Sequence, residues 1–505
     1  MAADDETRGR ALRLLGEVSA LRVAVAAEGR ALFNGWRGRI ARGAFGPSAL
    51  NFAQYLAVRH RDLRPLQRRL MVLGVSSLGR LEGRVLASLD AVAMALAALA
   101  GKRGPTPPSE RQFFRGEMRL AVNAAECFGP PHRGRIGRIM VTLSPESADD
   151  PAIVHGFADA GADAFRINCA HDSEAKWMRM VAHIRAAERE TGRRLPLLMD
   201  IGGPKVRTDR VLTPPDRRLH IGDIILLARE IQPALTEVPF QTTCTLPQIL
   251  DRLAVGDQVS IDDGELLGVI TAEAHGGFLL RIEKGKLAGA RLRPEKGLNF
   301  PETDLGLDPL TDKDRKDLDF IVRNADMIGH SFVQNAEHVA SLQAELARRR
   351  ADWQRLVLVG KIETPAAVAN LPEIIVQAAG RQPFAVMIAR GDLAVEMGFE
   401  RVAEMQEEIM WICEAAHVPL IWATQVLEEL VKKGLPSRGE MTDAAMAARA
   451  ECVLLNKGPN VAAAVGVLDR LLRRMGEHQV KKTPTLRALH SWQHREPARV
   501  KQPTP

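Results

Sequence analysis

A lysine and two carboxylates stand at the ends of two apolar runs in the second half of the chain. Lys361 and Glu363 lie two residues apart in GKIET, so on a β-strand their side chains point to the same face. Asp392 follows the next apolar run, FAVMIA. Two carboxylates from neighbouring strand ends can hold one Mg²⁺ that keeps its other positions for substrate and water. The alternative is a Lys361–Glu363 ion pair that only stabilises the fold, and the adjacent ARGDL segment favours the metal site.

Polar side chains also end several other apolar runs. These runs are ADAFRI, LPLLM, PLIWA and CVLL, and the polar residues that end them are Arg166, Asn168, Asp200, Thr424, Asn456 and Lys457. Short apolar runs that alternate with helical stretches predict βα units around a parallel sheet. In a (β/α)₈ barrel the chemistry is carried at the carboxyl ends of the strands. The repetition of this pattern therefore favours a barrel active site over coincidence.

The alternation predicts an α/β protein with a (β/α)₈ barrel, interrupted by a small inserted β-barrel domain and preceded by an all-α extension. The interval between Asp200 and a helix near Thr311 is far longer than an ordinary βα loop. It contains β-forming runs such as DQVSIDDGELLGVITAEA, separated by Gly-Asp, Asp-Gly and Gly-Gly turns. We expect a helical extension and linker at 1–135, the barrel at 136–205 and 299–478, the inserted domain at 206–298, and a flexible tail at 479–505.

Composition and net charge argue against some classes of function, nucleic-acid binding in particular. The chain has 505 residues, 4% aromatic residues and a single Tyr, which argues against base stacking on nucleic acid. The net charge of +7 comes from the extension, where five arginines could form an anion patch or simply the solvated face of a helix: Arg59, Arg61, Arg64, Arg68 and Arg69. The solvated face is the favoured reading, so nucleic acid is not an expected partner.

The cysteine spacing and the chain start predict a cytoplasmic location. Five scattered cysteines without CxxC spacing indicate reduced thiols. The start of the chain fits neither a secretory signal nor a transit peptide. The most apolar stretch, 85–100, is too short to span a bilayer and contains Asp90, so no membrane association is expected.

Nine segments in collinear order resemble the signatures of the pyruvate kinase family. They are VTLSPES (141–147), FRINCAHD (165–172), MDIGGPKVRT (199–208), DDGEL (262–266), KGLNFP (296–301), LTDKD (310–314), GKIET (360–364), MIARGDLAVE (387–396) and ATQVLE (423–428). One such segment alone would be weak evidence for the family, but nine segments in the order of the family are a specific signal. The resemblance covers residues 136–475. It implies transfer of a phosphoryl group from phosphoenolpyruvate to ADP, with Mg²⁺ or Mn²⁺, and it allows a homo-oligomer formed through the barrel.

The resemblance implies a role for each matching residue. Lys361, Thr424 and Arg166 would be catalytic: the lysine neutralises the phosphoryl group in flight, and the threonine helps to protonate the enolate. The substrate would contact Arg166, Arg207, Lys361, Gly391, Asp392 and Thr424. The nucleotide would contact Arg166, His171 and Arg207, and the metal ligands would be Glu363 and Asp392. Arg390 is either a substrate neighbour or a structural ion-pair former.

The chain departs from the family around the monovalent-cation site, the region of Asn168 and Asp200. Ala170 replaces a serine ligand, and Lys205 replaces a nearby glutamate. Loss of a ligand oxygen and addition of a tethered ammonium predict that K⁺ is not required. Ile201 and Gly202 stand where the family usually has Thr and Lys.

Two further departures concern the nucleotide side and the end of the barrel. Ser144 stands where a Gly is usual, and residues 455–460 replace a Ser-Gly-Glu-Thr-Ala segment. The residues after Met475 are too few for the family's effector domain, so control by sugar phosphates is not expected. Two alternative functions stay open: a metal-enolate lyase or aldolase acting on an oxo acid, and a non-catalytic metabolite-binding homologue. The presence of DDGEL favours the kinase.

Overall fold

The computed structural model describes residues 2–132, 134–301, 303–481 and 483–484. Eight parallel strands close into a barrel in the order β1, β15, β14, β13, β12, β11, β3, β2. Their bounds are Arg138–Thr142 (β1), Ala164–Asn168 (β2), Leu197–Asp200 (β3), Met327–His330 (β11), Val357–Ile362 (β12), Phe384–Ala389 (β13), Leu420–Ala423 (β14) and Cys452–Leu455 (β15). The predicted α/β barrel is therefore confirmed.

The barrel strands are buried on both faces, which explains their nearly continuous apolar sequences. Their register aligns the carboxyl ends on one rim. Asn168 pairs with Asp200 across β2 and β3, and Ala389 pairs with Ala423 across β13 and β14. Residues that follow these positions therefore meet at the same rim.

Helices cover the outside of the barrel. The main ones are α7 (Pro151–Ala160), α8 (Glu174–Thr191), α9 (Asp312–Asn324), α10 (Ala336–Arg349), α12 (Leu371–Ala379), α14 (Phe399–Ala415), α16 (Arg438–Ala447) and α17 (Val461–His478). Shorter helices follow three strand ends: α11 (Pro365–Ala369), α13 (Arg390–Met397) and α15 (Glu428–Lys433). Thr311 and Asp314 form a capping box that begins α9, so this helix starts where the sequence predicts it.

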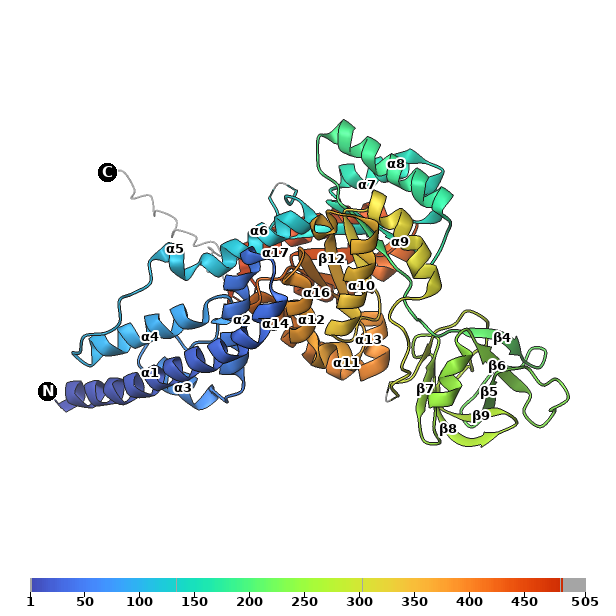
Figure 1. Ribbon diagram of the computed structural model, residues 1–505, viewed down its shortest axis with the longest axis horizontal. Helices are drawn as coiled ribbons and strands as arrows, with labels where there is room; N and C mark the ends of the chain where they lie inside the picture. Colours follow the sequence, from blue (N-terminus) through green and yellow to red (C-terminus); the bar gives the residue numbers. More distant parts are fainter. Residues whose placement is uncertain (1, 133, 302, 482, 485–505) are drawn as a thin grey trace, which may run out of the picture.

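A second sheet is inserted between β3 and α9 and extends away from the barrel (Figure 1). Its strands are β4 (Thr208–Leu212), β5 (Ile224–Ala228), β6 (Phe240–Cys244), β7 (Gln258–Ile261), β8 (Leu266–Ala274), β9 (Gly277–Gly285) and β10 (Leu298–Asn299), in the order β10-β7-β8-β9-β5-β6-β4. The two ends of the sheet meet, because Arg207 bridges Gly297 and the Leu298 amide donates to the Val206 carbonyl. The sheet encloses a hydrophobic core of its own.

The helical extension packs on the opposite side of the barrel from the inserted sheet (Figure 1). It contains α1 (Ala2–Trp36), α2 (Gly46–Arg59), α3 (Arg64–Val72), α4 (Val85–Leu99), α5 (Glu110–Phe113) and α6 (Arg115–Phe128). Its apolar residues join the same hydrophobic core as the barrel helices. Asn51 on α2 ties the extension to the barrel, since its amide donates to the Ala415 carbonyl at 2.8 Å.

The end of the described chain is short. Gln479–Val480 (β16) pairs with Thr483–Pro484 (β17), while residues 482 and 485–505 of the expected tail lie outside the described residues. Over the described part of the chain, no helix has the combined length and apolarity needed to cross a bilayer.

Candidate active site

Lys361 lies at the centre of a buried polar cluster at the carboxyl end of β12. Its Nζ atom lies 2.9 Å from Glu363 Oε1 and 3.8 Å from Asp200 Oδ2, and it donates to Ser331 Oγ at 2.8 Å. Ser331 in turn donates to the Ile201 carbonyl at 2.7 Å. The ammonium is therefore held by groups from three strand ends, in an orientation set by the hydroxyl and the carboxylates.

Arg166 approaches the same cluster from β2. Its Nε and Nη2 atoms lie 2.8 and 2.6 Å from Asp200 Oδ2, and Nη1 donates to Thr142 Oγ1 at 3.2 Å. Asp200 is fully buried, and a Cβ atom at Gly329 would lie 2.0 Å from its Oδ1 atom. Glycine at 329 is therefore required for the Asp200 side chain to fit. Two cations, Arg166 and Lys361, thus flank one buried carboxylate.

Asp392 lies in the first turn of α13, where Lys205 reaches it from the loop that enters the inserted sheet. Lys205 Nζ donates to Asp392 Oδ1 at 2.7 Å and lies 3.7 Å from Asp263 Oδ1. Burial alone would lower the pKa of Lys205, but the carboxylates of Asp392, Asp263 and Glu363 outweigh it and raise the pKa. Lys205 therefore stays charged and neutralises a carboxylate that the sequence assigns to the metal.

Glu363 and Asp392 offer the donor set of a magnesium site. Glu363 is 1% exposed, and its Oε2 accepts from the Phe332 amide, so the carboxyl group is fixed in place. Burial raises the pKa of Glu363, Lys361 opposes the shift, and the charge of Asp392 adds to it. A divalent cation between the two carboxylates would relieve this repulsion. Mg²⁺ is commonly held by one or two carboxylates together with substrate oxygens, so these residues fit the ion.

Thr424 and Gly391 lie in contact at the ends of β14 and β13. A Cβ atom at Gly391 would lie 2.9 Å from Thr424 Cγ2, so a larger residue there would displace the threonine. Thr424 has a φ of 69°, a left-handed conformation that a β-branched residue rarely adopts. Arg390 supports this turn, because it donates to the Ala423 and Thr424 carbonyls and pairs with Asp443. These contacts favour a structural role for Arg390, as an ion-pair former, over a role as a substrate neighbour.

His171 and Arg207, assigned to the nucleotide, lie on the other flank of the rim. Arg207 donates to the Glu295 carbonyl at 3.1 Å. Burial lowers the pKa of His171, and the positive charges of Lys457 and Arg207 lower it further. A cavity of about 730 Å³ is lined by Ser144, Pro145 and the segment 457–459, which includes the Lys457 whose charge acts on His171. Lys457, from the altered last-strand segment, therefore lies close enough to act on the histidine that the resemblance assigns to the nucleotide.

In the region assigned to the monovalent cation, several polar groups bind one another. Asn168 Oδ1 accepts from the Ala170 amide at 3.1 Å, and Lys313 donates to the Cys169 carbonyl at 2.7 Å. Asp314 Oδ1 accepts from the amides of Gly202 and Gly203 and so fixes the loop that leads to Lys205. The ammonium of Lys205 itself lies on Asp392 rather than on Asp200.

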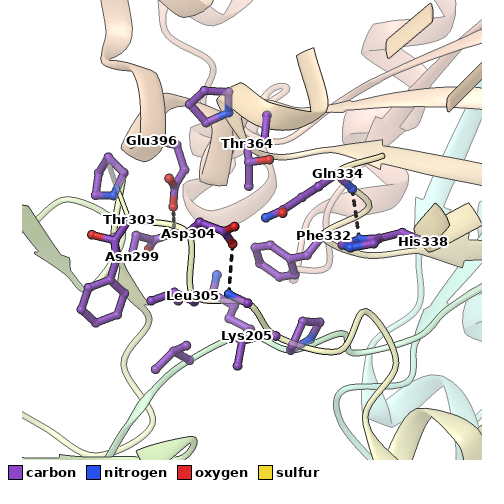
Figure 2. Close-up of a pocket in the computed structure, with 18 of the residues that line it drawn as sticks. Lys205, Asn299, Thr303, Asp304, Leu305, Phe332, Gln334, His338, Thr364 and Glu396 are labelled. Carbon is purple, nitrogen blue, oxygen red and sulfur yellow. Dashed lines mark hydrogen bonds between the residues drawn. The ribbon is translucent and has the colours of Figure 1, made fainter. Parts of the chain in front are cut away.

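Sequence reasoning gave no role to Ser331 or Glu396. Burial raises the pKa of Glu396 to about 7, and Asn299 on β10 donates to its Oε1 atom at 2.7 Å. Figure 2 shows this pair in a cavity of about 660 Å³ between the barrel and the connection to the inserted sheet, with Lys205 beside it. Glu396 lies within the MIARGDLAVE segment, four residues after Asp392, so its helical spacing was the available signal.

The closed parallel barrel, with a sheet inserted after its third strand and an ionisable cluster at its carboxyl rim, defines an enzyme of the (β/α)₈-barrel class. A family model described as "Pyruvate kinase, barrel domain" matches residues 134–462. The pyruvate kinase of Methylorubrum extorquens is 33% identical over 350 residues, which is 68% of this chain and 69% of the relative.

Two other pyruvate kinases show a similar likeness. One from Agrobacterium vitis is 32% identical over 68% of this chain and 70% of the relative. One from Geobacillus stearothermophilus is 31% identical over 61% of this chain and 51% of the relative. The chain belongs to the pyruvate kinase family and is a phosphotransferase by that membership. The helical extension precedes the residues that the family model matches.

Proposed function

We propose that this chain transfers the phosphoryl group of phosphoenolpyruvate to ADP and releases pyruvate and ATP, with Mg²⁺ between Glu363 and Asp392. The observation that carries the proposal is the buried cluster around Lys361. Its ammonium contacts Glu363 at 2.9 Å and Ser331 at 2.8 Å, while Arg166 lies on the neighbouring Asp200. Phosphoryl transfer depends mainly on positioning and on neutralising charge, and a lysine and an arginine beside a carboxylate pair supply both.

In this proposal each side chain acts on a stated atom. Arg166 and Lys361 contact the oxygens of the transferred phosphoryl group, and a Mg²⁺ held by Glu363 and Asp392 would supply positive charge that stabilises the developing enolate. Gly391 lets the main chain approach the substrate carboxylate, because no Cβ atom blocks it. The hydroxyl of Thr424, next to Gly391, faces the enolate carbon where the proton is added.

The nucleotide is proposed to bind in the cavity between Ser144 and Lys457. His171 is neutral at pH 7, because burial and the nearby cations lower its pKa, so it can accept a hydrogen bond from a ribose hydroxyl. Arg207 belongs to the inserted domain and contacts the phosphates when that domain approaches the barrel. This arrangement assigns Lys457 to the nucleotide and compensates for the lost Ser-Gly-Glu-Thr-Ala segment.

We further propose that K⁺ is not required and that the reaction takes place in the cytoplasm. Ala170 leaves the region of Asn168 and Asp200 without the serine ligand of the family, and Lys205 brings a tethered ammonium to the same rim, although this ammonium lies on Asp392 rather than on Asp200. All five cysteines are buried and unpaired, which fits a reducing compartment.

A coupled assay tests the function directly. Purified full-length protein is mixed with phosphoenolpyruvate and ADP, and pyruvate is measured through lactate dehydrogenase with and without Mg²⁺. Mg²⁺-dependent pyruvate formation, with ATP in equal amount, supports the proposal. Pyruvate without ATP would indicate a different reaction, and no turnover with saturating substrates and Mg²⁺ or Mn²⁺ would contradict the proposal.

The alternative enzyme is a metal-enolate lyase or aldolase that acts on an oxo acid. It would use the same Glu363–Asp392 pair but would need no nucleotide. The cavity beside Ser144 and the cationic neighbours of His171 favour the kinase, since they would accommodate a nucleotide, which the alternative does not use. Incubation of the enzyme with oxaloacetate, without ADP, measures the lyase activity separately.

A further inference from the structure

Helix α6 of the extension carries a row of large apolar residues that is exposed on the surface of the described chain. Phe114 directly precedes the helix, and Met118 and Val122 follow at intervals of four residues, so the three lie on one face. They are 39%, 45% and 66% exposed. A contiguous apolar row, unlike single scattered residues, is typical of an interaction surface.

This row borders a cavity of about 350 Å³ between the extension and the amino-terminal end of the barrel. Leu120, Ala121 and Ala124 of the same helix line the cavity. Because an α-helix has 3.6 residues per turn, Ala121 lies between the cavity wall and Met118. The row and the cavity mouth therefore form one apolar surface, the α6 surface, which consists of Phe114, Met118, Ala121, Val122, Ile136 and Val480.

The charged groups around the cavity are paired with one another. Arg449 forms a bidentate pair with Glu407, at 2.6 and 2.8 Å. Burial lowers the pKa of Arg80 and of Arg138, and nearby carboxylates oppose the shift. Two further pairs are Glu451 with Lys481 and Glu117 with Arg84. Recognition at the α6 surface therefore depends on apolar contact rather than on an unpaired charge.

The described part of the chain ends beside the α6 surface. Gln479 and Val480 of β16 line the cavity, and Lys481 follows them. Gln479 pairs with Pro484 of β17, and paired strands lie about 4.8 Å apart, so the segment that follows Pro484 begins next to the cavity. Residues 485–505 continue the chain from this point.

The sequence that follows Pro484 has an apolar pattern that matches the α6 surface. Leu486, Leu489 and Trp492 recur every third residue in TLRALHSW, a spacing that would place them on one face of a helix. Such a helix would extend about 9 Å from the first to the last of the three, and the row from Phe114 to Val122 extends about 12 Å. The two apolar rows are therefore similar in length.

We propose that the segment 485–492 binds to the α6 surface of its own chain, with Leu486 nearest the cavity and with Leu489 and Trp492 along Met118 and Val122. The occupant is this segment because its attachment point lies at the cavity and its apolar residues have the required spacing. The bound segment would connect the extension, which supplies α6, to the barrel, which supplies the surroundings of Ile136 and Val480. The proposed phosphoryl transfer takes place at the carboxyl end of the barrel and does not depend on this contact.

The fluorescence of Trp492 tests the proposal in the full-length protein. The emission of Trp492 is obtained by subtracting the spectrum of Trp492→Phe from that of the unchanged chain, and its exposure is measured by acrylamide quenching. Trp492 should be shielded in the unchanged chain, and Met118→Glu should raise its quenching constant at least threefold. Met178→Glu, at a methionine of α8 that is 49% exposed, is the matched control and should leave the quenching unchanged. Circular dichroism checks that both variants are folded.

A disulfide cross-link identifies which chain supplies the segment. All five natural cysteines are buried, so oxidation of Val122→Cys combined with Leu489→Cys should join mainly the two new thiols. The expected product is a cross-linked monomer, and Met178→Cys with Leu489→Cys should give none. A cross-linked dimer would assign the α6 surface to a second copy and overturn the proposal. Quenching of Trp492 that is as strong in the unchanged chain as in Met118→Glu, or absence of any cross-link, would also reject it.

Discussion

Lys205 donates a 2.7 Å hydrogen bond to Asp392, although the two residues are 187 positions apart in the chain. The lysine lies in the loop that enters the inserted sheet, and the aspartate lies in the first turn of α13. The ammonium also lies 3.7 Å from Asp263 of the inserted sheet. A cation from the connection between two parts of the molecule is thus paired with a carboxylate at the barrel rim.

The first prediction concerns Lys205 and the monovalent cation. The unchanged enzyme should have equal initial rates in K⁺, Na⁺ and tetramethylammonium buffers of matched ionic strength. Lys205→Met removes the tethered ammonium, so the variant should lose most of its activity in tetramethylammonium and recover part of it in K⁺. Lys286→Met, which removes an exposed lysine of the inserted sheet, is the control. A several-fold stimulation of the unchanged enzyme by K⁺ alone would show that this account of Lys205 is wrong.

The second prediction concerns Lys361. Replacement by Met should lower kcat by a factor on the order of 10³ or more, because the ammonium acts mainly on charge in the transition state. Mg²⁺ binding, measured by competition with Mn²⁺ in electron paramagnetic resonance, should change little, since Glu363 keeps its bond from the Phe332 amide. Lys432→Met on α15 removes an exposed ion pair and should leave kcat unchanged. Near-normal turnover of Lys361→Met would rule out the assigned role.

The third prediction concerns Ser331, which joins Lys361 to the Ile201 carbonyl. Ser331→Ala removes a hydrogen bond to a charged group, an effect of about 1.5 kcal/mol, so kcat should fall about tenfold. The KM for phosphoenolpyruvate should change less, because the charge of Lys361 is retained. Ser88→Ala removes another buried hydroxyl group, on α4 of the helical extension, and serves as the control. An unchanged kcat with lowered thermal stability would show that Ser331 has only a structural role.

The fourth prediction uses the pKa of Glu396, which burial raises to about 7. The folded state holds this proton more tightly than the unfolded state, so the free energy of unfolding should decrease as pH rises from about 5 to 7. Glu396→Gln resembles the protonated form and can still accept from Asn299, so the decrease should be smaller in the variant. Urea unfolding at pH 5, 6, 7 and 8 measures the difference, with the exposed Glu400→Gln as control. If the free energy of unfolding depended on pH in the same way for Glu396→Gln and for the wild-type protein, the raised pKa would not belong to Glu396.

Much of the fold could be predicted because the barrel is encoded locally. Each buried strand is a short apolar run, and each polar residue that follows it lies at the rim by the geometry of parallel strands. The inserted sheet was predictable from its turn residues, such as His275 and Gly276, which both adopt positive φ between β8 and β9. The proximity of Lys361 and Glu363 follows from strand geometry, because side chains two residues apart on one strand point to the same face.

The contacts of individual side chains could not be predicted in the same way. The contact of Lys205 with Asp392 depends on the path of a loop between two domains. The spacing of apolar residues in the sequence carries no information about that path. Ser331 meets Lys361 from a different strand, 30 residues away, and the hydroxyl gives no pattern of its own. The packing of α6 against the rest of the molecule could not be predicted either, because it is determined by side-chain shapes over the whole interface.

The contact between Asn51 and Ala415 determines the order in which the molecule can be assembled. These residues are 364 positions apart, and the extension is synthesised long before the helix that receives it. Helices α1, α2 and α4 can pair with one another at once, but the surface that α2 shares with α14 has no partner until most of the barrel has been translated. The apolar surface of the extension that meets α14 therefore stays without its partner during most of synthesis.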